Sequence, residues 1–154
     1  MSSTAIMTAN PLTLKESDSV ADAARALIEH RYINMPVVDA AGRFLGMFGI
    51  YDLLGLLIPR VALAGDLLPN LRFIGHDGAA LREKYATVKA KTVGECCDRQ
   101  AVTLAPDTPE IEAVRLFCRK HTTLAVVEPG TKKLLGIVSY WDAIAAVSGE
   151  TGPA

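Results

Sequence analysis

The sequence of 154 residues is poor in cysteine and carries no sign of export. It contains three cysteines, and two of them, Cys96 and Cys97, are adjacent. An odd number with an adjacent pair does not make a disulfide framework, so we expect a reducing, cytoplasmic setting. The N-terminus lacks the basic and long apolar segments of a secretory signal. Further ligands at metal-binding spacing are missing near Cys96 and Cys97, so we interpret both as ordinary helix residues.

Charge of one sign and long apolar runs are also scarce. The 16 basic and 17 acidic residues give a net charge of −1. Because binding to a phosphate backbone requires a basic surface, nucleic acid is not expected as the main partner. The most apolar stretch, residues 53–68, contains Pro59, Arg60 and Asp66 and lacks the ~20 apolar residues of a membrane span. Hydrophobic residues still make up 50%, which is typical of a globular protein.

Catalytic motifs are absent as well. The sequence has no Gly-x-Ser-x-Gly, no phosphate-binding glycine loop ending in Lys-Ser/Thr and no His-Glu-x-x-His. Cys118 is not paired with a histidine at any recognisable spacing. We therefore predict that the chain is not an enzyme and requires no cofactor.

The sequence does contain one unit twice. Gly136-Ile137-Val138-Ser139-Tyr140-Trp141-Asp142 repeats the pattern of Gly46-Met47-Phe48-Gly49-Ile50-Tyr51-Asp52, with the same distance between the two glycines as between the two aspartates. A single copy of ~50 residues would bury too little surface to be stable alone. We therefore predict two copies related by a pseudo-twofold axis that pack face to face and share one core.

Both copies show the same local elements. Residues 12–14 and 102–104 read as short strands, and each is followed by an amphipathic helix. Ser19 and Thr108 are expected to cap these helices. A hairpin and a second helix complete each copy. The hairpin residues expected on buried strands are Val37, Val38, Val126 and Val127.

This pattern divides the chain into repeat 1 (1–59), an insert (60–91) and repeat 2 (92–150). The insert contains a predicted helix at 79–90 and an apolar group within residues 67–74. A plain connector would be shorter and more polar. Two interpretations stay open, namely that the insert packs back on its own domain or that it forms a dimer or partner surface.

The order of helix, Met35-Pro36-Val37-Val38-Asp39, hairpin and Gly-apolar-apolar-Ser-x-x-Asp, present twice, resembles a pair of cystathionine β-synthase (CBS) domains, or Bateman module. The resemblance covers nearly the whole chain except residues 60–91. It implies an α+β (mixed α/β) fold of two β-α-β-β-α repeats. It also implies a regulatory module that binds an adenosine-containing ligand, such as AMP, ADP, ATP or S-adenosylmethionine, and that forms a homodimer.

The chemistry of the repeated motif agrees with such a ligand. A carboxylate at the start of a helix can accept hydrogen bonds from the two vicinal hydroxyls of a ribose. Nearby helix N–H groups favour an anion, and a serine hydroxyl can bond the ribose or a phosphate. The chain that crosses before Pro36 offers backbone groups to an adenine edge, and Ile33 and Met35 offer apolar contacts.

By resemblance, each cleft contains the aspartate of one repeat and the residues that lead into the first hairpin strand of the other repeat. The first cleft would contain Ser139 and Asp142 with Tyr32, Ile33, Asn34 and Met35. The second would contain Asp52 with His121, Thr122 and Thr123. The second departs from the pattern, because Gly49 stands where Ser or Thr is expected and Ala125 where proline is expected. We therefore predict that the first cleft binds ligand more strongly. The simpler alternative is that both aspartates only cap helices.

Two functions remain open at this stage. In the first, a ligand that bridges the repeats shifts their relative orientation, and a separate partner protein reads the change. In the second, the chain is a ligand-free protein-interaction or dimerisation module. A homodimer is expected in either case through the helices after Asp52 and Asp142, which are unusually apolar. The residues on which this rests are Leu53, Leu54, Leu56, Leu57, Ile144 and Val147.

Overall fold

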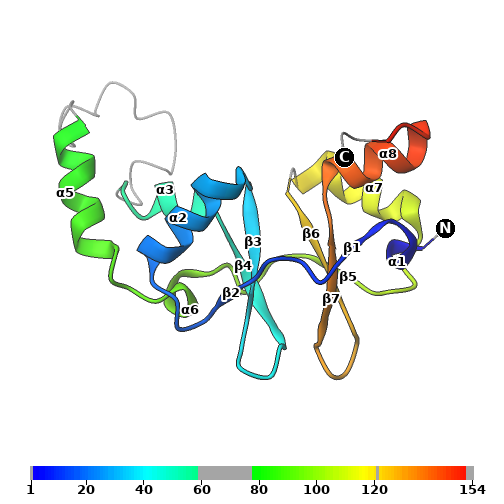
Figure 1. The fold of residues 1–154 in the computed structure, drawn as a ribbon, viewed down its shortest axis with the longest axis horizontal. Coiled ribbons are helices and arrows are strands. Elements are labelled where there is room, and N and C mark those ends of the chain that lie inside the picture. Colours follow the sequence, from blue (N-terminus) through cyan, green and yellow to red (C-terminus); the bar gives the residue numbers. More distant parts are fainter. Residues whose placement is uncertain (1, 59–77, 121, 152–154) are drawn as a thin grey trace.

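The computed structural model describes residues 2–58, 78–120 and 122–151. It consists of two lobes that lie side by side, each with a small sheet and helices packed against it (Figure 1). The first lobe contains the three-stranded sheet β2-β3-β4, and the second contains the four-stranded sheet β1-β7-β6-β5. The predicted α+β fold with two β-α-β-β-α repeats is confirmed.

The elements of repeat 1 are β2 (Leu14–Lys15), α2 (Val20–His30), β3 (Asn34–Val38), β4 (Phe44–Gly49) and α3 (Ile50–Gly55). Those of repeat 2 are β5 (Thr103–Leu104), α7 (Glu110–Lys120), β6 (Leu124–Val127), β7 (Leu134–Val138) and α8 (Tyr140–Ser148). Four further elements are α1 (Ser3–Ile6), β1 (Thr8–Ala9), α5 (Gly78–Val88) and α6 (Val93–Cys96).

The two repeats begin their first helices differently. Ser19 caps α2 as predicted, because its Oγ accepts a hydrogen bond from Asp22 N at 3.1 Å and the Asp22 carboxylate accepts one from Ser19 N at 3.1 Å. The predicted cap at Thr108 is wrong. Thr108 Oγ1 instead accepts from Ala105 N at 3.0 Å, and α7 begins at Glu110, directly after Pro109, which forms a β-bridge with Ser2.

The β3–β4 and β6–β7 hairpins contribute buried residues to the apolar cores. β3 and β4 pair antiparallel, as do β6 and β7. Val37, Val38 and Val126 are buried as predicted, whereas Val127 is only partly buried. Val127 lies beside a register shift at the turn end of its hairpin. The predicted single shared core is wrong, because each lobe has its own apolar cluster, one containing Phe48 and the other Leu124.

Each lobe also borrows a segment from outside its repeat. β1 belongs to repeat 1 but pairs antiparallel with β7 of repeat 2. Conversely, Val93 of α6 is fully buried in the core of the first lobe, and Asp98 and Met47 exchange backbone hydrogen bonds of 2.8 and 3.1 Å. A Cβ on Gly46 or Gly136 would lie within 2.6 Å of the borrowed backbone, so only glycine admits these segments.

The hairpin tips join the lobes directly. Phe44 N donates to Lys132 O at 2.8 Å, and Leu134 N donates to Gly42 O at 3.3 Å. These bonds hold the two hairpins side by side, as Figure 1 shows for the loops that end β3 and β6. The exchanged segments and the joined tips fix the lobes around a shared axis.

Part of the insert packs on the first lobe. The helix predicted at 79–90 is α5, whose Val88 is buried and whose Tyr85 lies against the first core. The apolar group predicted within residues 67–74 lies outside the described residues. The division into residues 1–59, 60–91 and 92–150 stays a prediction.

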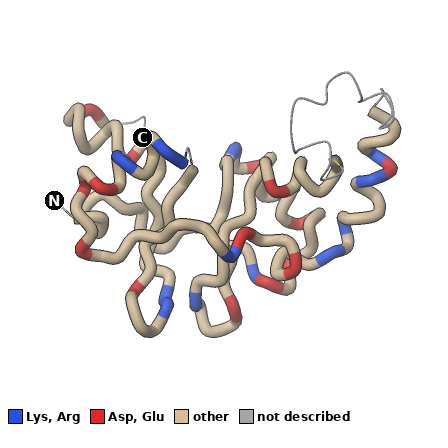
Figure 2. The backbone as a smooth tube through the Cα atoms, turned by 180° about the vertical axis from the view of Figure 1, so that it is seen from behind, with Lys and Arg blue, Asp and Glu red and all other residues tan. Residues whose placement is uncertain are grey.

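The described surface mixes both signs of charge. Acidic and basic residues are interspersed along both lobes (Figure 2). In the part of the chain that is described, no helix has the length and apolarity needed to cross a bilayer.

Candidate functional site

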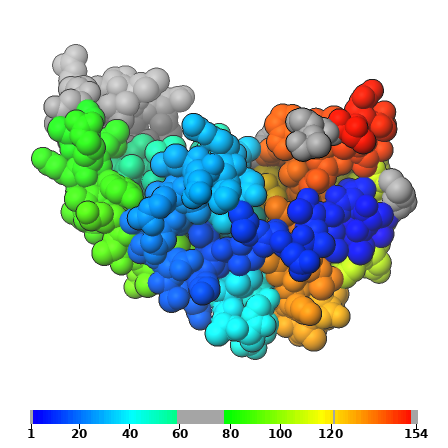
Figure 3. Space-filling view, viewed as in Figure 1, coloured from blue at the N-terminus to red at the C-terminus, as the bar shows by residue number. Residues whose placement is uncertain are grey.

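A cleft between the lobes contains the aspartate of repeat 2, and we call it the Asp142 cleft. Its volume is about 300 Å³. The space-filling view shows the surface hollowed between the lobes, at the end of α2 and the start of α8 (Figure 3). The lining residues are Thr8, Leu12, residues 31–36, Thr123, Ile137 and residues 139–142. The structure thus brings together all six residues predicted for the first cleft, namely Tyr32, Ile33, Asn34, Met35, Ser139 and Asp142.

Asp142 is held by hydroxyl and amide groups. Ser139 is the N-cap of α8, and its Oγ accepts from Asp142 N at 3.2 Å. Asp142 Oδ2 accepts from Ser139 N at 2.8 Å and from Ser139 Oγ at 2.9 Å. Thr8 Oγ1 donates to Asp142 Oδ1 at 3.4 Å. Asp142 is therefore the third helical residue of a capping box rather than the N-cap itself. In the described contacts Oδ2 accepts two hydrogen bonds and Oδ1 accepts one, so a lone pair of Oδ1 is left for a ligand.

The walls of the Asp142 cleft are apolar and aromatic. Tyr32 is 39% exposed, Ile33 is 38% exposed and Trp141 is 77% exposed. Met35, by contrast, is 3% exposed and belongs to the core of the first lobe, so it forms the floor. Sequence reasoning missed Thr8 and Trp141. Trp141 sits inside the repeated motif, but Thr8 reaches the cleft only through the pairing of β1 with β7.

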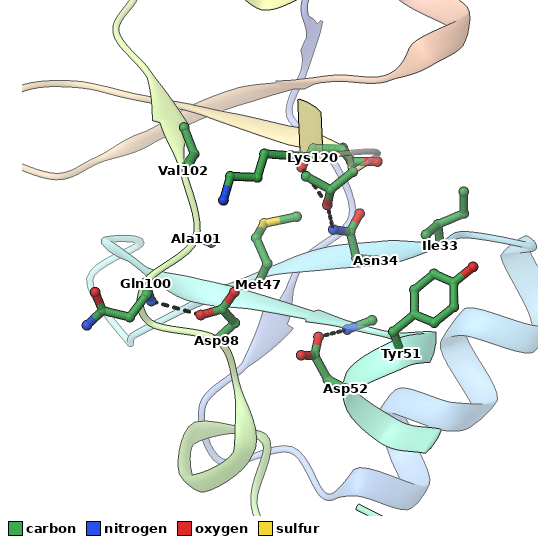
Figure 4. A pocket seen from close by; sticks show the side chains of 13 residues that line it. Ile33, Asn34, Met47, Tyr51, Asp52, Asp98, Gln100, Ala101, Val102 and Lys120 are labelled. Atoms are coloured by element: carbon green, nitrogen blue, oxygen red, sulfur yellow. Dashed lines mark hydrogen bonds between the residues drawn. The ribbon is translucent and has the colours of Figure 1, made fainter. Parts of the chain in front are cut away.

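The second cleft contains the aspartate of repeat 1, and we call it the Asp52 cleft. Its volume is about 240 Å³, and Figure 4 shows its side chains. Its lining residues are Ile33, Asn34, Met47, Gly49, Tyr51, Asp52, Asp98, Gln100, Ala101, Val102, Lys120, Thr122 and Thr123. Asp52, Thr122 and Thr123 meet here as predicted, whereas His121 lies outside the described residues. Ile33, Asn34 and Thr123 line both clefts.

Asp52 has different neighbours from Asp142. Its Oδ2 accepts from Gly49 N at 2.8 Å, but position 49 offers no hydroxyl. Burial raises the pKa of Asp52, and the charge of Asp98 raises it further, against the lowering effect of the Gly49 hydrogen bond. Asp98 Oδ1 accepts from Gln100 N at 2.9 Å. Sequence reasoning missed Asp98, Gln100 and Lys120, because the region around Asp98 has no motif of its own.

Steric crowding requires glycine at position 49. A Cβ at this position would lie 2.5 Å from Ile33 O and 2.6 Å from Asn34 Cβ. Asn34 pairs with Gly49 in the β3–β4 hairpin, so the two backbones are close. The departure from the expected serine therefore has a structural cause, and a side chain cannot be added without moving β3.

Asn34 stands at the boundary between the clefts. Its Nδ2 donates to Thr122 Oγ1, and this hydrogen bond connects the start of β3 in repeat 1 to the residues before β6 in repeat 2. Its Oδ1 is buried and has no hydrogen-bond partner among the described residues. A buried acceptor without a partner is unfavourable, so a donor from a ligand would stabilise this site.

Metal binding has no support in the described residues, since nowhere among them do three His, Cys, Asp or Glu side chains gather at a metal-binding distance. The polar groups of both clefts are carboxylates, hydroxyls, amides and a few cations. Such groups suit a polar organic ligand with hydroxyl and amine donors.

Comparison with known proteins adds two related findings. A curated Arabidopsis thaliana protein, the chloroplastic CBS domain-containing protein CBSX2, is 43% identical over 42 residues, which cover 27% of this chain and 18% of that protein. The crystal structure of CBSX2 in complex with AMP is 25% identical, has a TM-score of 0.69, and matches 95% of both chains. Since the curated relative is chloroplastic, a cytoplasmic location stays a prediction.

A second similar structure is the CBS domain pair of protein MJ0100 in complex with 5'-methylthioadenosine and S-adenosyl-L-methionine. It is 20% identical with a TM-score of 0.65, and the match covers 98% of each chain, which shows the shared fold. The family model for the CBS domain matches residues 4–59 and 93–149. This chain therefore belongs to the CBS domain family and carries the domain twice.

Proposed function

We propose that the chain is a non-catalytic regulatory module that binds an adenosine-containing ligand between its two CBS domains. The observation that carries this proposal is the Asp142 cleft, in which Ser139 and Asp142 face the crossing of repeat 1 at Tyr32–Asn34. AMP, ADP, ATP and S-adenosylmethionine are the candidate ligands. Support also comes from CBSX2, whose crystal structure contains AMP.

The parts of such a ligand have matching groups in the cleft. A ribose hydroxyl would donate to Oδ1 of Asp142, because Oδ2 already accepts two hydrogen bonds from Ser139. The adenine would lie against Ile33 and Tyr32, which are partly exposed at the cleft wall. A phosphate would lie near the N-terminus of α8, a nine-residue helix, where N–H groups favour an anion, with Arg31 at the rim.

The signal would be a shift in the orientation of the lobes. A ligand that contacts both lobes stabilises one arrangement over others by its difference in affinity for them. A separate partner protein would read this change. The cytoplasm is the location that fits a chain with unpaired cysteines, and nucleic acid is not proposed as a partner on a surface of mixed charge.

We further propose a homodimer through the exposed faces of α3 and α8. The apolar side chains exposed there are Tyr51, Leu54, Trp141, Ile144 and Val147. Leu53 and Leu56, which the sequence placed on this face, instead pack against the core of the first lobe. Between α7 and α8 lies a shallow apolar cavity of about 210 Å³. A second copy of this chain would cover these side chains.

Sedimentation of two matched variants tests the dimer. Ile144→Lys, on α8, should convert a micromolar dimer to monomer, because a charge would be buried at the interface. Ile28→Lys, on the exposed side of α2, is the control, since Ile28 is 66% exposed and lies off the proposed face. A wild-type monomer at micromolar concentration, or equal effects of both variants, would contradict the proposal.

The ligand-free interaction module is the second candidate function. It is favoured by one observation, namely that Ser139 and Asp142 already satisfy each other in a capping box. An aspartate in this arrangement stabilises a helix without any ligand.

Thermal unfolding with a ligand panel separates the two functions. The panel contains AMP, ADP, ATP, S-adenosylmethionine and NAD. A ligand present at 100 times its dissociation constant adds ~2.7 kcal/mol to the free energy of unfolding, which shifts the midpoint measurably. If none of the five raises the midpoint at millimolar concentration, the interaction module is the better function.

A further inference from the structure

The two clefts place different groups at one equivalent position. Thr8 pairs with Ile137 of β7, and Asp98 pairs with Met47 of β4. Ile137 and Met47 each precede the N-cap position of the next helix by two residues, so Thr8 and Asp98 occupy corresponding places in the two lobes. Thr8 donates a hydrogen bond to Asp142, whereas Asp98 adds a second negative charge next to Asp52.

The presence of Asp98 where the other lobe has Thr8 changes the net charge of the Asp52 cleft. Among the described lining residues, the Asp52 cleft has two carboxylates, Asp52 and Asp98, and one ammonium group, Lys120. In Figure 4 these three side chains surround the same space. The described lining of the Asp142 cleft has one carboxylate, Asp142, and one guanidinium, Arg31, which balance each other. A cation is therefore favoured in the Asp52 cleft, and an anionic phosphate is disfavoured there.

Two features of the Asp52 cleft leave hydrogen-bond acceptors without a donor from the protein. Gly49 removes the hydroxyl that would donate to Asp52, and space excludes a side chain at that position. Asn34 presents a buried Oδ1, which is an acceptor and has no hydrogen-bond partner in the described part of the chain. Both features leave acceptors that a ligand with donors or positive charge would satisfy.

We propose that Asp98 is a specificity-determining residue that makes the Asp52 cleft select a positively charged adenosine derivative, of the sulfonium class, over a neutral or phosphorylated one. This rests on the proposed function, because it assigns a ligand class to one of the two adenosine clefts. The Asp142 cleft, with Thr8 at the corresponding position, has no such preference and accepts phosphorylated adenosine.

S-adenosylmethionine and S-adenosylhomocysteine are the probes, because they differ by one methyl group on sulfur and its positive charge. Titration calorimetry is done in an Asp142→Asn background, which weakens the other cleft. S-adenosylmethionine should bind about tenfold more tightly than S-adenosylhomocysteine there, as expected for a positive charge near one partly buried and one exposed carboxylate. Adding Asp98→Thr, which copies the residue of the other cleft, should bring the ratio of the two dissociation constants close to one.

The methyl group itself is controlled, because the same two compounds are compared with and without Asp98, and only the carboxylate differs between the two ratios. Asp98→Asn serves as the isosteric second variant and should act in the same direction. It retains the backbone bonds of residue 98 to Met47. Lys120→Gln, which removes the cation, should increase the preference for S-adenosylmethionine. AMP affinity in the same cleft should rise in Asp98→Thr, because a carboxylate that repels the phosphate is lost.

The outcomes separate this inference from the proposed function. An unchanged ratio in both Asp98 variants, with adenosine compounds still bound, would overturn the role of Asp98 and leave the adenosine module intact. A ratio near one in the Asp142→Asn background would do the same. Absence of binding for AMP and both sulfur compounds in the wild-type chain would remove the proposed function and this inference together.

Discussion

The Asp142 cleft surrounds its aspartate with hydroxyl groups, whereas the Asp52 cleft places a second carboxylate beside its aspartate. Ser139 and Thr8 both donate to Asp142. The corresponding positions near Asp52 are Gly49 and Asp98, and neither offers a hydroxyl. The same backbone plan therefore carries two chemically different sites. The repeat fixes where the aspartates stand, and the neighbours on borrowed segments decide what they can bind.

The comparison is tested most strongly by removing each aspartate's charge in turn. Asp142→Asn should lower the affinity for AMP by about ten- to a hundredfold, because a hydrogen bond to a charged group contributes roughly 1.5–3 kcal/mol. The helix should remain, since Ser139 still caps it and the amide oxygen of asparagine can accept from Ser139 N as Asp142 does. Asp52→Asn should lower AMP affinity less. Titration calorimetry of both variants is the measurement.

Two results would break this comparison. Equal AMP affinity in Asp142→Asn and the wild type would reduce Asp142 to its role in the capping box. A greater loss in Asp52→Asn would show that the main nucleotide site is the other cleft.

Gly49→Ser tests whether the missing hydroxyl can be restored. The new Cβ would meet Ile33 O and Asn34 Cβ at 2.5 and 2.6 Å, so we expect a loss of about 1–3 kcal/mol in stability, as for other overpacked sites. Chemical denaturation measures this loss. Gly42→Ser is a contrasting control without crowding, because nothing lies within 4 Å of a Cβ there, although its φ of +81° carries its own strain. A Gly49→Ser variant as stable as the wild type would contradict the spatial argument.

Asp52→Asn should have the smallest effect, and it should be stabilising. Burial and Asp98 raise the pKa of Asp52, so the folded state holds this charge less well than the unfolded chain does. Since the group is about half exposed, we expect a gain below about 1 kcal/mol, or at most roughly 2–4 °C in melting midpoint at pH 7.

The sign of this effect depends on pH. An aspartate with a raised folded-state pKa destabilises the fold only where it is ionised, so the penalty grows as pH rises above the ordinary aspartate range. The advantage of Asp52→Asn over the wild type should therefore be present at pH 7 and vanish below about pH 4. The matched variant Asp142→Asn should show no such gain, because Asp142 is held by Ser139 and Thr8. A gain of equal size in both variants would contradict the difference between the clefts.

The sequence by itself determined the repeat, the order of the elements and the position of both aspartates. These features are encoded locally, in the spacing of apolar residues, in capping residues such as Ser19 and in the glycine before each return strand. The six residues predicted for the first cleft come together for the same reason, since each lies at a fixed place in its repeat.

Only the tertiary structure decided which groups stand beside each aspartate. Thr8 and Asp98 reach the clefts by crossing to the other lobe, and Ser2 pairs with Pro109 directly before α7. The sequence indicated that Gly49 weakens the second cleft, but the close approach of Ile33 and Asn34 to position 49 requires glycine there. Contacts between residues distant in sequence set these features, and no local pattern of propensity or periodicity records such contacts.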